Sequence, residues 1–525
     1  MNSDLDARIG EALARLPDYL GGHVRVSMTA LALGIALSVP LALVSIRRPA
    51  FRAIVLGLSS IVQTIPGLAL LALFYPLLLG LAALSTRAFG VSFSALGFLP
   101  AVLALALYSL LPVLRNAVTG LTGIDPAIKE AALGVGMTRR QALWMVELPL
   151  ALPVVMAGIR TAAVWVIGTA TLSTPIGQTS LGNYIFAGLQ TQNWVLVLFG
   201  CVAAALLALA VDQLLALIEG GFRVRRRGRI IAGTLGMALI VVGALAPGWS
   251  QPKARYLVGA KTFAEQYIIA ALIEQRLQAA GLSAARREGL GSSVILDALA
   301  ANELDVYVDY TGTIWANDLH RNDTKPRAEL TAEVAQWLKE RRGITLLGGL
   351  GFENAYALAM PKKRAEALGV RTIEDLARVA PQLAIAGDYE FFSRPEWAAI
   401  RAAYGLTFRT QRTMQPEFMY PAVASGDVDV VAGYTSEGRI AQYDLVVLED
   451  TKHVIPPYDA VILLAPRDAN DRALIDAVRP LVGAIDVELM RAASLRATSG
   501  SDDRSPDAVA RWMWGEIARR KNAKP

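Results

Sequence analysis

The sequence predicts two structural parts, an α-helical membrane domain with six transmembrane helices and, after it, a two-lobed α/β domain. Of the 525 residues, 54% are hydrophobic, and the mean hydropathy of +0.41 is typical of a membrane protein. The charges are unevenly divided, because residues 1–250 carry 26 of the 96 charged side chains and residues 251–525 carry the other 70. We therefore expect a membrane domain over 1–248, a linker at 249–253 and a water-exposed domain over 254–525.

Six apolar runs in the first part are long enough to cross a bilayer. They cover residues 22–46, 53–83, 96–121, 148–175, 194–218 and 230–248. Arginine and lysine gather in the loops after the first, third and fifth runs, and the loops between these are nearly free of them. The positive-inside rule then places the three basic loops in the cytoplasm and the second half of the chain outside the cell.

From Ala254 onward, short β-branched strands alternate with amphipathic helices. Strands are expected at 255–261, 304–310, 344–350, 383–387, 428–434 and 444–448, with a helix over 264–280. Alternation of this kind predicts an α/β architecture with mainly parallel sheets. About 270 residues are enough for two lobes.

Composition and motifs exclude several functions. Residues 1–250 have a net charge of +8 and residues 251–525 of −2, so the high pI belongs to the membrane loops and does not indicate nucleic-acid binding. One cysteine, Cys201, and three scattered histidines give no disulfide and no His/Cys metal site. Gly259-Ala260-Lys261-Thr262 lacks the glycines of a phosphate-binding loop. We expect no catalytic residue, metal or cofactor on this chain, with ATP and Mg²⁺ held by a separate ATPase.

Residues 130–149, EAALGVGMTRRQALWMVELP, lie in the predicted cytoplasmic loop between the third and fourth spans. They resemble the EAA loop of ABC-importer permeases, in which a short coupling helix docks on a separate ATPase. The resemblance implies a type I importer permease fold and makes Glu130, Ala131, Ala132 and Gly136 the expected coupling residues. The alternative is an ordinary amphipathic cytoplasmic loop.

Three further stretches of the membrane half, at 63–67, 111–116 and 168–172, look like stretches of osmoprotectant permeases. A glutamine such as Gln63 or an arginine such as Arg115 is costly at membrane depth unless it faces a cavity or a partner. A role in the translocation path is one interpretation, and a proline kink with an interfacial arginine is the other.

Six blocks of the second half resemble the quaternary-amine (glycine betaine, choline, carnitine) substrate-binding proteins, in the same order. They are GAKTFAEQ at 259–266, VDYTGT at 308–313, FENAYAL at 352–358, FFSRPE at 391–396, DVDVVAGYTSEGRI at 427–440 and PPYDA at 456–460. The resemblance implies a type II periplasmic-binding-protein fold with the ligand between two lobes.

A quaternary ammonium has no N–H group, so hydrogen bonds cannot select it, whereas the faces of aromatic rings attract it. The resemblance implies a cage of four tyrosines, one from each of four blocks: Tyr310, Tyr356, Tyr434 and Tyr458. It also implies polar ligand-binding side chains, three for a ligand carboxylate and one that supports the cage: Lys261, Thr313, Arg394 and Asn354. Departures from the family blocks at Ala264, Ala355 and Glu437 leave several trimethylated ligands open, ergothioneine among them.

These observations favour the permease and substrate-binding subunit of an ATP-driven ABC importer for quaternary ammonium osmoprotectants, in the bacterial cytoplasmic (inner) membrane. The expected partners are a cytoplasmic ABC ATPase dimer, a second permease copy or a homologous permease, the small ligand and membrane lipid. Two alternatives remain. One is an importer of another small zwitterion such as an amino acid, and the other is a membrane solute receptor that does not transport.

Overall fold

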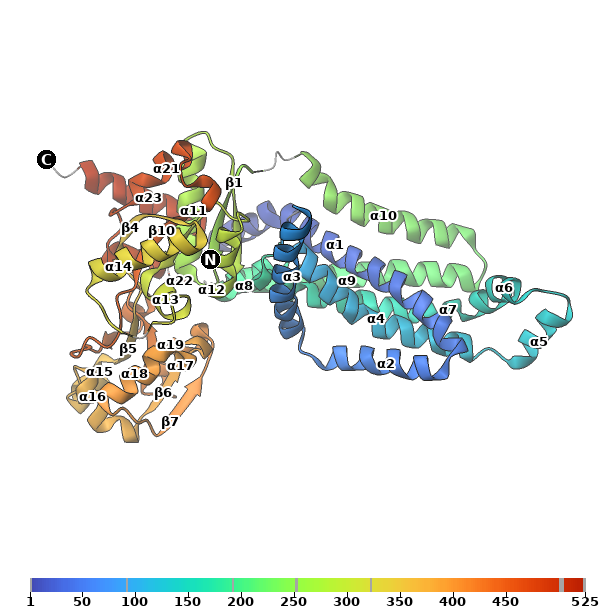
Figure 1. Cartoon of the computed structure of the whole chain (residues 1–525), viewed down its shortest axis with the longest axis horizontal. Coiled ribbons are helices and arrows are strands. Elements are labelled where there is room, and N and C mark those ends of the chain that lie inside the picture. Colours follow the sequence, from blue (N-terminus) through green and yellow to red (C-terminus); the bar gives the residue numbers. More distant parts are fainter. Residues whose placement is uncertain are drawn as a thin grey trace. The chain divides into compact units, whose positions relative to one another are not determined.

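The computed structural model describes residues 2–90, 93–190, 193–250, 254–321, 323–499 and 505–522. The chain divides into two compact units, one of Ala12–Ile185 with Val197–Pro252 and the other of Lys253–Pro525 with the short stretches Met1–Glu11 and Phe186–Leu196. Each is described on its own, and Figure 1 labels its elements.

The membrane half of the chain, residues 2–250, consists of helices in its described residues. They are α1 (Asn2–Arg47), α2 (Pro49–Thr64), α3 (Gly67–Phe89), α4 (Phe98–Thr122), α5 (Pro126–Gly134), α6 (Arg139–Ala142), η1 (Leu143–Glu147), α7 (Leu148–Ala170), η2 (Thr171–Ile176), α8 (Gly182–Gln190), α9 (Trp194–Arg223) and α10 (Arg227–Ser250). Six helical stretches in the described residues are long and apolar enough to cross a membrane. The predicted number of spans is therefore confirmed.

The second predicted span, 53–83, is not one helix. The chain forms α2, breaks at Ile65 and Pro66, and starts again as α3. Ile65 has an extended backbone, with φ −74° and ψ 126°, because the ring of a following proline disfavours the helical conformation. Only Gly67–Phe89 is apolar and long enough to count as a span. The prediction of a continuous helix was wrong because it rested on the apolar composition of 53–83 and did not allow for the helix break at Pro66.

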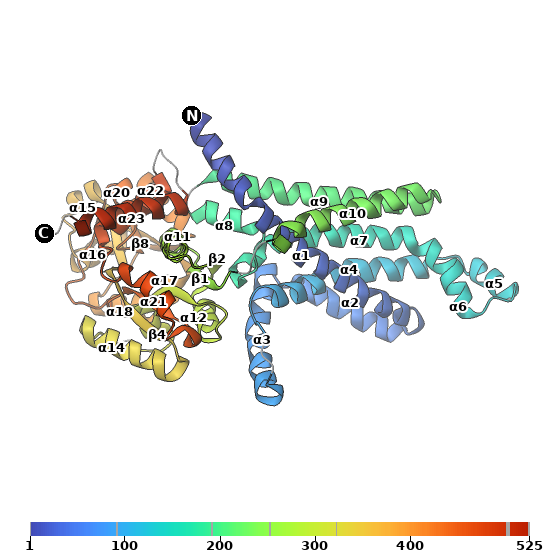
Figure 2. The same cartoon turned by 90° about the horizontal axis from the view of Figure 1, so that it is seen from above.

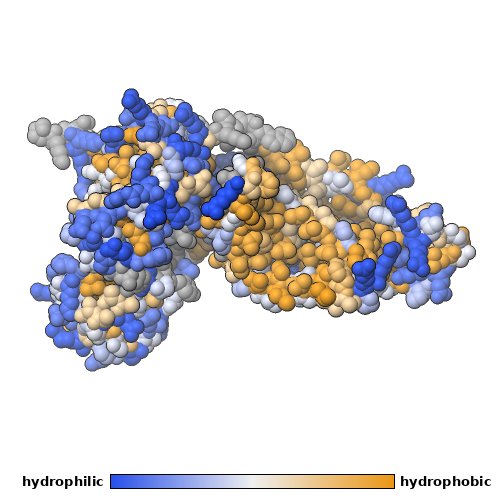
Figure 3. All heavy atoms as spheres, viewed as in Figure 1, coloured by the Kyte–Doolittle hydropathy of each residue, from blue (hydrophilic) through white to orange (hydrophobic). Residues whose placement is uncertain are grey.

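The surface of the membrane helices suits a lipid environment. In Figure 3 the visible face of these helices is almost continuously apolar. Helix α3 runs across the direction of α4 and α7 in both Figure 1 and Figure 2, and it exposes Leu73, Leu77 and Leu84. Helices α5 and α6 lie beyond the ends of α4 and α7 in both views, away from the apolar spans.

The second unit has two five-stranded sheets, one for each lobe. The first sheet has the strand order β2-β1-β3-β10-β4 and the second has β7-β6-β8-β5-β9. The first contains β1 (Tyr256–Lys261), β2 (Ala284–Leu290), β3 (Val306–Tyr310), β4 (Thr345–Glu353) and β10 (Asp459–Leu464). The second contains β5 (Tyr356–Pro361), β6 (Ala384–Gly387), β7 (Thr410–Thr413), β8 (Val430–Tyr434) and β9 (Leu445–Val447). The α/β two-lobed fold is confirmed, and the six predicted strands are all present.

The prediction of mainly parallel sheets was wrong. Strands β1, β2 and β3 pair in parallel, as do β6, β7 and β8, but β10 and β5 pair antiparallel with their neighbours. The reason is the chain path between the lobes. Strand β5 enters the second lobe directly from β4, after only Asn354 and Ala355, and β10 returns to the first sheet from the second lobe. Both strands therefore enter their sheet from the other lobe and not through a βαβ crossover within the same sheet, which is what sets a parallel pair.

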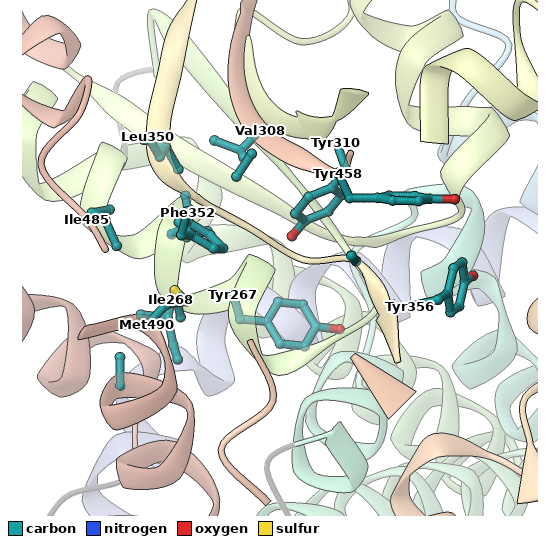
Figure 4. Packing of buried hydrophobic residues seen from close by; sticks show 14 of the residues in the cluster. Tyr267, Ile268, Val308, Tyr310, Leu350, Phe352, Tyr356, Tyr458, Ile485 and Met490 are labelled. Carbon is teal, nitrogen blue, oxygen red and sulfur yellow. The ribbon is translucent and has the colours of Figure 1, made fainter. Parts of the chain in front are cut away.

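Helices cover both sheets. They are α11 (Ala264–Ala279), α12 (Ser292–Ala300), α13 (Thr311–Asn317), α14 (Arg327–Trp337), α15 (Lys362–Leu368), α16 (Ile373–Val379), α17 (Tyr389–Ser393), α18 (Pro395–Tyr404), α19 (Pro416–Ser425), α20 (Arg439–Gln442), α21 (Arg472–Val478), α22 (Val487–Ser499) and α23 (Pro506–Asn522). Figure 4 shows part of the core, in which Ile268 of α11, Val308 of β3 and Leu350 of β4 are packed. Tyr310, Tyr356 and Tyr458 belong to the same cluster.

The predicted linker at 249–253 differs from the structure at its start. Residues 249 and 250 are the last residues of α10. Residues 251–253 lie outside the described residues.

Candidate functional site

A cavity of about 230 Å³ lies between the two lobes. It opens where β1, β6 and β8 end, which is where ligands bind in open α/β sheets. The first lobe contributes the start of α11, and the second lobe contributes the segments that follow β6 and β8. Its lining residues are Thr262, Phe263, Ala264, Glu265, Ser292, Asn354, Asp388, Gln415, Tyr434, Ser436, Glu437, Arg439 and Ser494.

Carboxylates dominate the charge of this cavity. Arg439 is the cation of the lining, and its guanidinium contacts Glu437 at 3.0 and 2.7 Å. Burial would raise the pKa of Glu437, but this ion pair outweighs burial and holds the pKa below its usual value. Glu265 and Asp388 add two further carboxyl groups. The lining therefore favours a ligand that carries positive charge.

Glu265 lies in the first turn of α11 and is buried. Burial raises its pKa to about 7, although the hydroxyls of Ser436 and Tyr310 and the amide of Asn354, 3.3 Å away, donate hydrogen bonds to the carboxyl group. A nearby cation would favour the ionised form. At neutral pH, a cationic ligand beside Glu265 would therefore shift this carboxyl group toward its ionised form.

Five aromatic rings form a continuous chain beside the cavity, and it crosses from one lobe to the other. The ring centroids are 6.1 Å apart for Tyr310 and Phe263, 6.4 Å for Phe263 and Tyr434, 5.0 Å for Tyr434 and Tyr356, and 5.7 Å for Tyr356 and Tyr458. The structure therefore brings the four predicted tyrosines into one cluster. Phe263 and Tyr434 line the cavity itself, whereas the other three rings pack behind them.

The polar side chains predicted for a ligand carboxylate are placed differently. Lys261, Thr313 and Arg394 are buried and are not part of the cavity lining. The ammonium group of Lys261 forms an ion pair with Asp309, one residue before Tyr310. A cation and an anion this close and this buried satisfy one another. The structure thus gives Lys261 a partner within its own lobe.

Arg394 lies in the second lobe, and its guanidinium contacts Glu396 at 3.4 Å and the Tyr458 hydroxyl at 3.4 Å. The hydroxyl of Tyr458, from the first lobe, donates to Glu396. These contacts hold the two lobes together next to the aromatic rings. Arg394 is therefore part of a polar contact between the two lobes.

Asn354 joins the lobes and lines the cavity. Its backbone N–H donates to the carbonyl of Tyr458 at 2.9 Å, which ties the two interlobe connections together. Its amide oxygen is buried and has no hydrogen-bond partner in the described part of the chain. This oxygen is an acceptor available at the cavity.

Sequence reasoning missed Phe263 and Glu265, although both lie in the block GAKTFAEQ. Their position in the sequence could have indicated a role in ligand binding. They follow directly on a predicted strand and open a predicted helix, and ligand-binding residues concentrate at that position in α/β folds. Asp388 gave a similar signal, because it follows β6 and caps α17 by accepting the backbone N–H of Phe391 at 2.6 Å.

The segment 130–149 contains the end of one short helix, α5, and, after a turn, the start of a long helical stretch that runs from α6 through η1 into α7. Asp125 caps α5 and Pro126 occupies its first turn, a common helix start. Gly136 has φ +86°, a left-handed conformation that favours glycine, so the chain can turn there. Thr138 and Gln141 then form a reciprocal capping box that starts α6. Glu130 and Ala131 are exposed on α5, whereas Ala132 is buried.

The turn between α5 and α6 exposes apolar side chains outside the membrane spans. Val135 is 75% exposed and Leu133 is 48% exposed. Exposed apolar side chains beside charged ones are typical of a protein-interaction surface. This surface matches the place where a partner is expected from the motif.

Comparison with known proteins decides the family. Residues 34–224 match the family of the binding-protein-dependent transport system inner membrane component, and residues 255–514 match the family of the substrate binding domain of ABC-type glycine betaine transport systems. The choline transport system permease protein OpuBB of Bacillus subtilis (strain 168) is 41% identical over 197 residues, which cover 38% of this chain and 83% of that protein. The chain belongs to the ABC-importer permeases, with a fused substrate-binding domain.

A relative with both parts is also known. This fused permease is 29% identical to the ergothioneine transport permease/ergothioneine binding protein EgtU of Helicobacter pylori (strain G27), over 79% of this chain and 74% of that protein. Among solved structures, the crystal structure of a glycine betaine/carnitine/choline ABC transporter aligns with a TM-score of 0.45 and 26% identity, over 50% of this chain and 98% of that chain.

The family defines the general role of the fused permease. It is a transporter subunit and not an enzyme, and a separate ATPase subunit hydrolyses the ATP. Its helices make it a multi-pass protein of the inner membrane, and its second domain is of the periplasmic binding type. The main functional prediction is confirmed at this level.

Proposed function

We propose that the fused permease imports a small quaternary ammonium compound such as glycine betaine, choline, carnitine or ergothioneine. The observation that carries this proposal is the lining of the interlobe cavity, where Phe263 and Tyr434 meet the carboxyl groups of Glu265 and Asp388. Aromatic faces and carboxylates are the two kinds of group that attract a cation without N–H donors. Relatives named for choline and ergothioneine transport support the same ligand class.

The cavity orients the ligand in this proposal. The trimethylammonium end faces Phe263 and Tyr434, near Glu265. Any polar tail points toward Gln415, Ser436 and Arg439, which offer hydrogen bonds. Lys261 and Arg394 act indirectly, because they position Tyr310 and Tyr458.

A binding panel tests the ligand class. The full-length chain in detergent is titrated calorimetrically with choline, glycine betaine, carnitine, ergothioneine and proline. We expect at least one trimethylammonium compound to bind and proline not to bind. Binding of proline alone would favour an importer of another small zwitterion, and binding without ATP-driven uptake by cells would favour a solute receptor.

Choline binding is expected to be tighter at higher pH. Choline keeps its charge at every pH, and the raised pKa of Glu265, about 7, means that this carboxyl group is largely protonated at pH 6 and largely ionised at pH 8. The cation favours the ionised form, so binding releases a proton. The fraction of ionised Glu265 rises about tenfold between pH 6 and 8, and we expect the dissociation constant to fall by up to this factor.

Glu265→Gln is the matched control for this pH dependence. It keeps the size of the side chain and removes its titration. The neighbouring charged groups, Glu437 and Arg439, are retained in the variant. We expect the variant to bind choline more weakly at pH 8 than the unaltered chain and to show a flat profile from pH 6 to 8. An unchanged profile would show that Glu265 is not the titrating group.

The proposal includes the partners of the membrane half. A cytoplasmic ATPase dimer docks on residues 130–149, with Leu133 and Val135 at the contact. A second permease copy, identical or homologous, completes a symmetric pathway. Exposed Arg115 and Thr119 of α4 support this, because an arginine inside a span is costly unless it faces protein or water.

A further inference from the structure

Three charged side chains meet inside the membrane spans. The Nε and Nη2 atoms of Arg160, on α7, donate to the two oxygens of Asp212 on α9 at 2.8 and 2.9 Å. The Nη1 atom of Arg160 donates to Glu219, also on α9, at 3.0 Å. Asp212 and Glu219 are seven residues apart, about two helical turns, so they lie on one face of α9. We call Arg160, Asp212 and Glu219 the intramembrane triad.

Two members of the triad lie away from the ends of their helices, whereas Glu219 lies four residues before the end of α9 at Arg223. Asp212 is eleven residues before the end of α9 at Arg223, or about 16 Å along the helix axis. Arg160 is twelve residues after the start of α7 at Leu148, or about 18 Å. Both helices belong to the stretches that can cross a membrane. Charged residues at this depth are costly, and a functional reason for keeping them is the default expectation.

Helix α7 is directly continuous with residues 130–149, which we call the coupling segment. The helical stretch from Arg139 to Ile176 runs through α6, η1, α7 and η2 without a break. On one side, α7 packs closely on α4, where a Cβ at Gly158 would lie 2.6 Å from the Cβ of Asn116. The triad forms the contact of α7 with α9. Any displacement of α6 by a partner is therefore applied first to α7.

Charged groups can hold two membrane helices together where apolar contacts cannot. Lipid tails are as apolar as leucine, so no hydrophobic driving force holds α7 against α9, and packing and polar contacts must do so. A bidentate arginine–carboxylate pair also has a specific geometry, so it fixes the angle and the register of the two helices that it joins. The triad therefore both attracts α7 to α9 and fixes their relative orientation.

We propose that the intramembrane triad makes α7 and α9 move as one rigid body. A displacement of the coupling segment then displaces α9 by the same amount as α7. Arg160, Asp212 and Glu219 are positioning residues in this scheme and do not contact the transported ligand. The inference rests on the coupling role proposed above for residues 130–149. It does not depend on the identity of the ligand.

The test measures the distance between the two helices. Leu150, exposed on α7, is replaced by cysteine and spin-labelled together with the native Cys201, which is exposed on α9. The full-length chain, purified with its ATPase and diluted with unlabelled chain, is measured by pulsed electron paramagnetic resonance without nucleotide and after trapping with ATP and orthovanadate. We expect one narrow distance that is the same in both states.

The triple variant Arg160→Met, Asp212→Leu, Glu219→Met removes the triad. It makes the spans more apolar, so membrane insertion is retained. We expect its distance distribution to be at least twice as wide as in the unaltered chain, already without nucleotide. Thr234→Val is the matched control, because Thr234 is a polar side chain of α10 whose hydroxyl donates to the carbonyl of Ile230 in the same helix. It should leave the distance narrow.

Two results would overturn the inference. One is a narrow, unchanged distance in the triple variant, and the other is a distance in the unaltered chain that shifts on trapping. No transported ligand is added, so an error in the proposed ligand class does not alter either result. An error in the proposed coupling role would leave the nucleotide-free comparison of the two chains intact.

Discussion

Replacing Tyr434 with alanine is expected to raise the dissociation constant of a quaternary ammonium ligand by about 10- to 30-fold. Tyr434 is one of two rings that line the cavity. A desolvated cation–π contact is worth up to ~2 kcal/mol, which corresponds to about 30-fold in affinity. Its hydroxyl also donates to Asp388 at 2.9 Å, and that carboxylate would lose a partner. Calorimetric titration of the full-length variant with choline gives the measurement.

Two further variants separate the ring from its surroundings. Tyr434→Phe keeps the ring and loses only the hydroxyl, so we expect a change of less than about fivefold, the size of one modest hydrogen bond. Tyr404→Phe changes a tyrosine of α18 whose hydroxyl bonds Asp450, outside the cavity lining, and should leave affinity unchanged. Equal losses in Tyr434→Ala and Tyr434→Phe would mean that the hydroxyl, and not the ring, binds the ligand.

Replacing Val135 with aspartate is expected to lower ATP-driven uptake at least tenfold and to leave ligand binding unchanged. Val135 is the most exposed apolar side chain at the turn between α5 and α6. If the ATPase covers this turn, the new carboxylate loses its hydration without gaining a partner, a penalty of several kcal/mol. Uptake by cells per amount of chain in the membrane, and calorimetric binding by the purified chain, are measured in parallel.

Val224→Asp provides the matched control for the coupling segment. Val224 is also exposed and apolar, but it lies among the arginines between α9 and α10. A carboxylate there meets positive charge and water, so uptake should stay within twofold of the unaltered chain. Full uptake by Val135→Asp would remove this turn from the ATPase contact. Loss of uptake in both variants would point to a general effect of added negative charge.

Local features were predictable from the sequence. Strand β3, for example, has two valines and two tyrosines among its five residues from Val306 to Tyr310, and the capping box at Thr138 depends on residues three apart. Such features depend on neighbours in the chain, so composition and periodicity reveal them. The break at Pro66 was also a local signal, but apolarity on both sides of it concealed the end of α2.

The partners of charged side chains were not predictable in the same way. Binding of a ligand carboxylate by Lys261 and Arg394 stays a prediction, and in the structure the two side chains contact Asp309 and Glu396. The choice between a ligand and an internal ion pair depends on which carboxylate the folded backbone brings within about 4 Å. Asp309 is far from Lys261 in the sequence, and no spacing rule connects them.

Local composition and short sequence blocks were enough to predict the division into two parts, the number of membrane spans, the EAA-like motif and the aromatic residues that gather beside the interlobe cavity. The folded chain was needed to show that Glu265 and Asp388 line the interlobe cavity with Phe263 and Tyr434, and that Arg160 on α7 contacts Asp212 and Glu219 on α9. Both arrangements join residues from distant segments. Their energies depend on distance and burial, which exist only after the chain has folded.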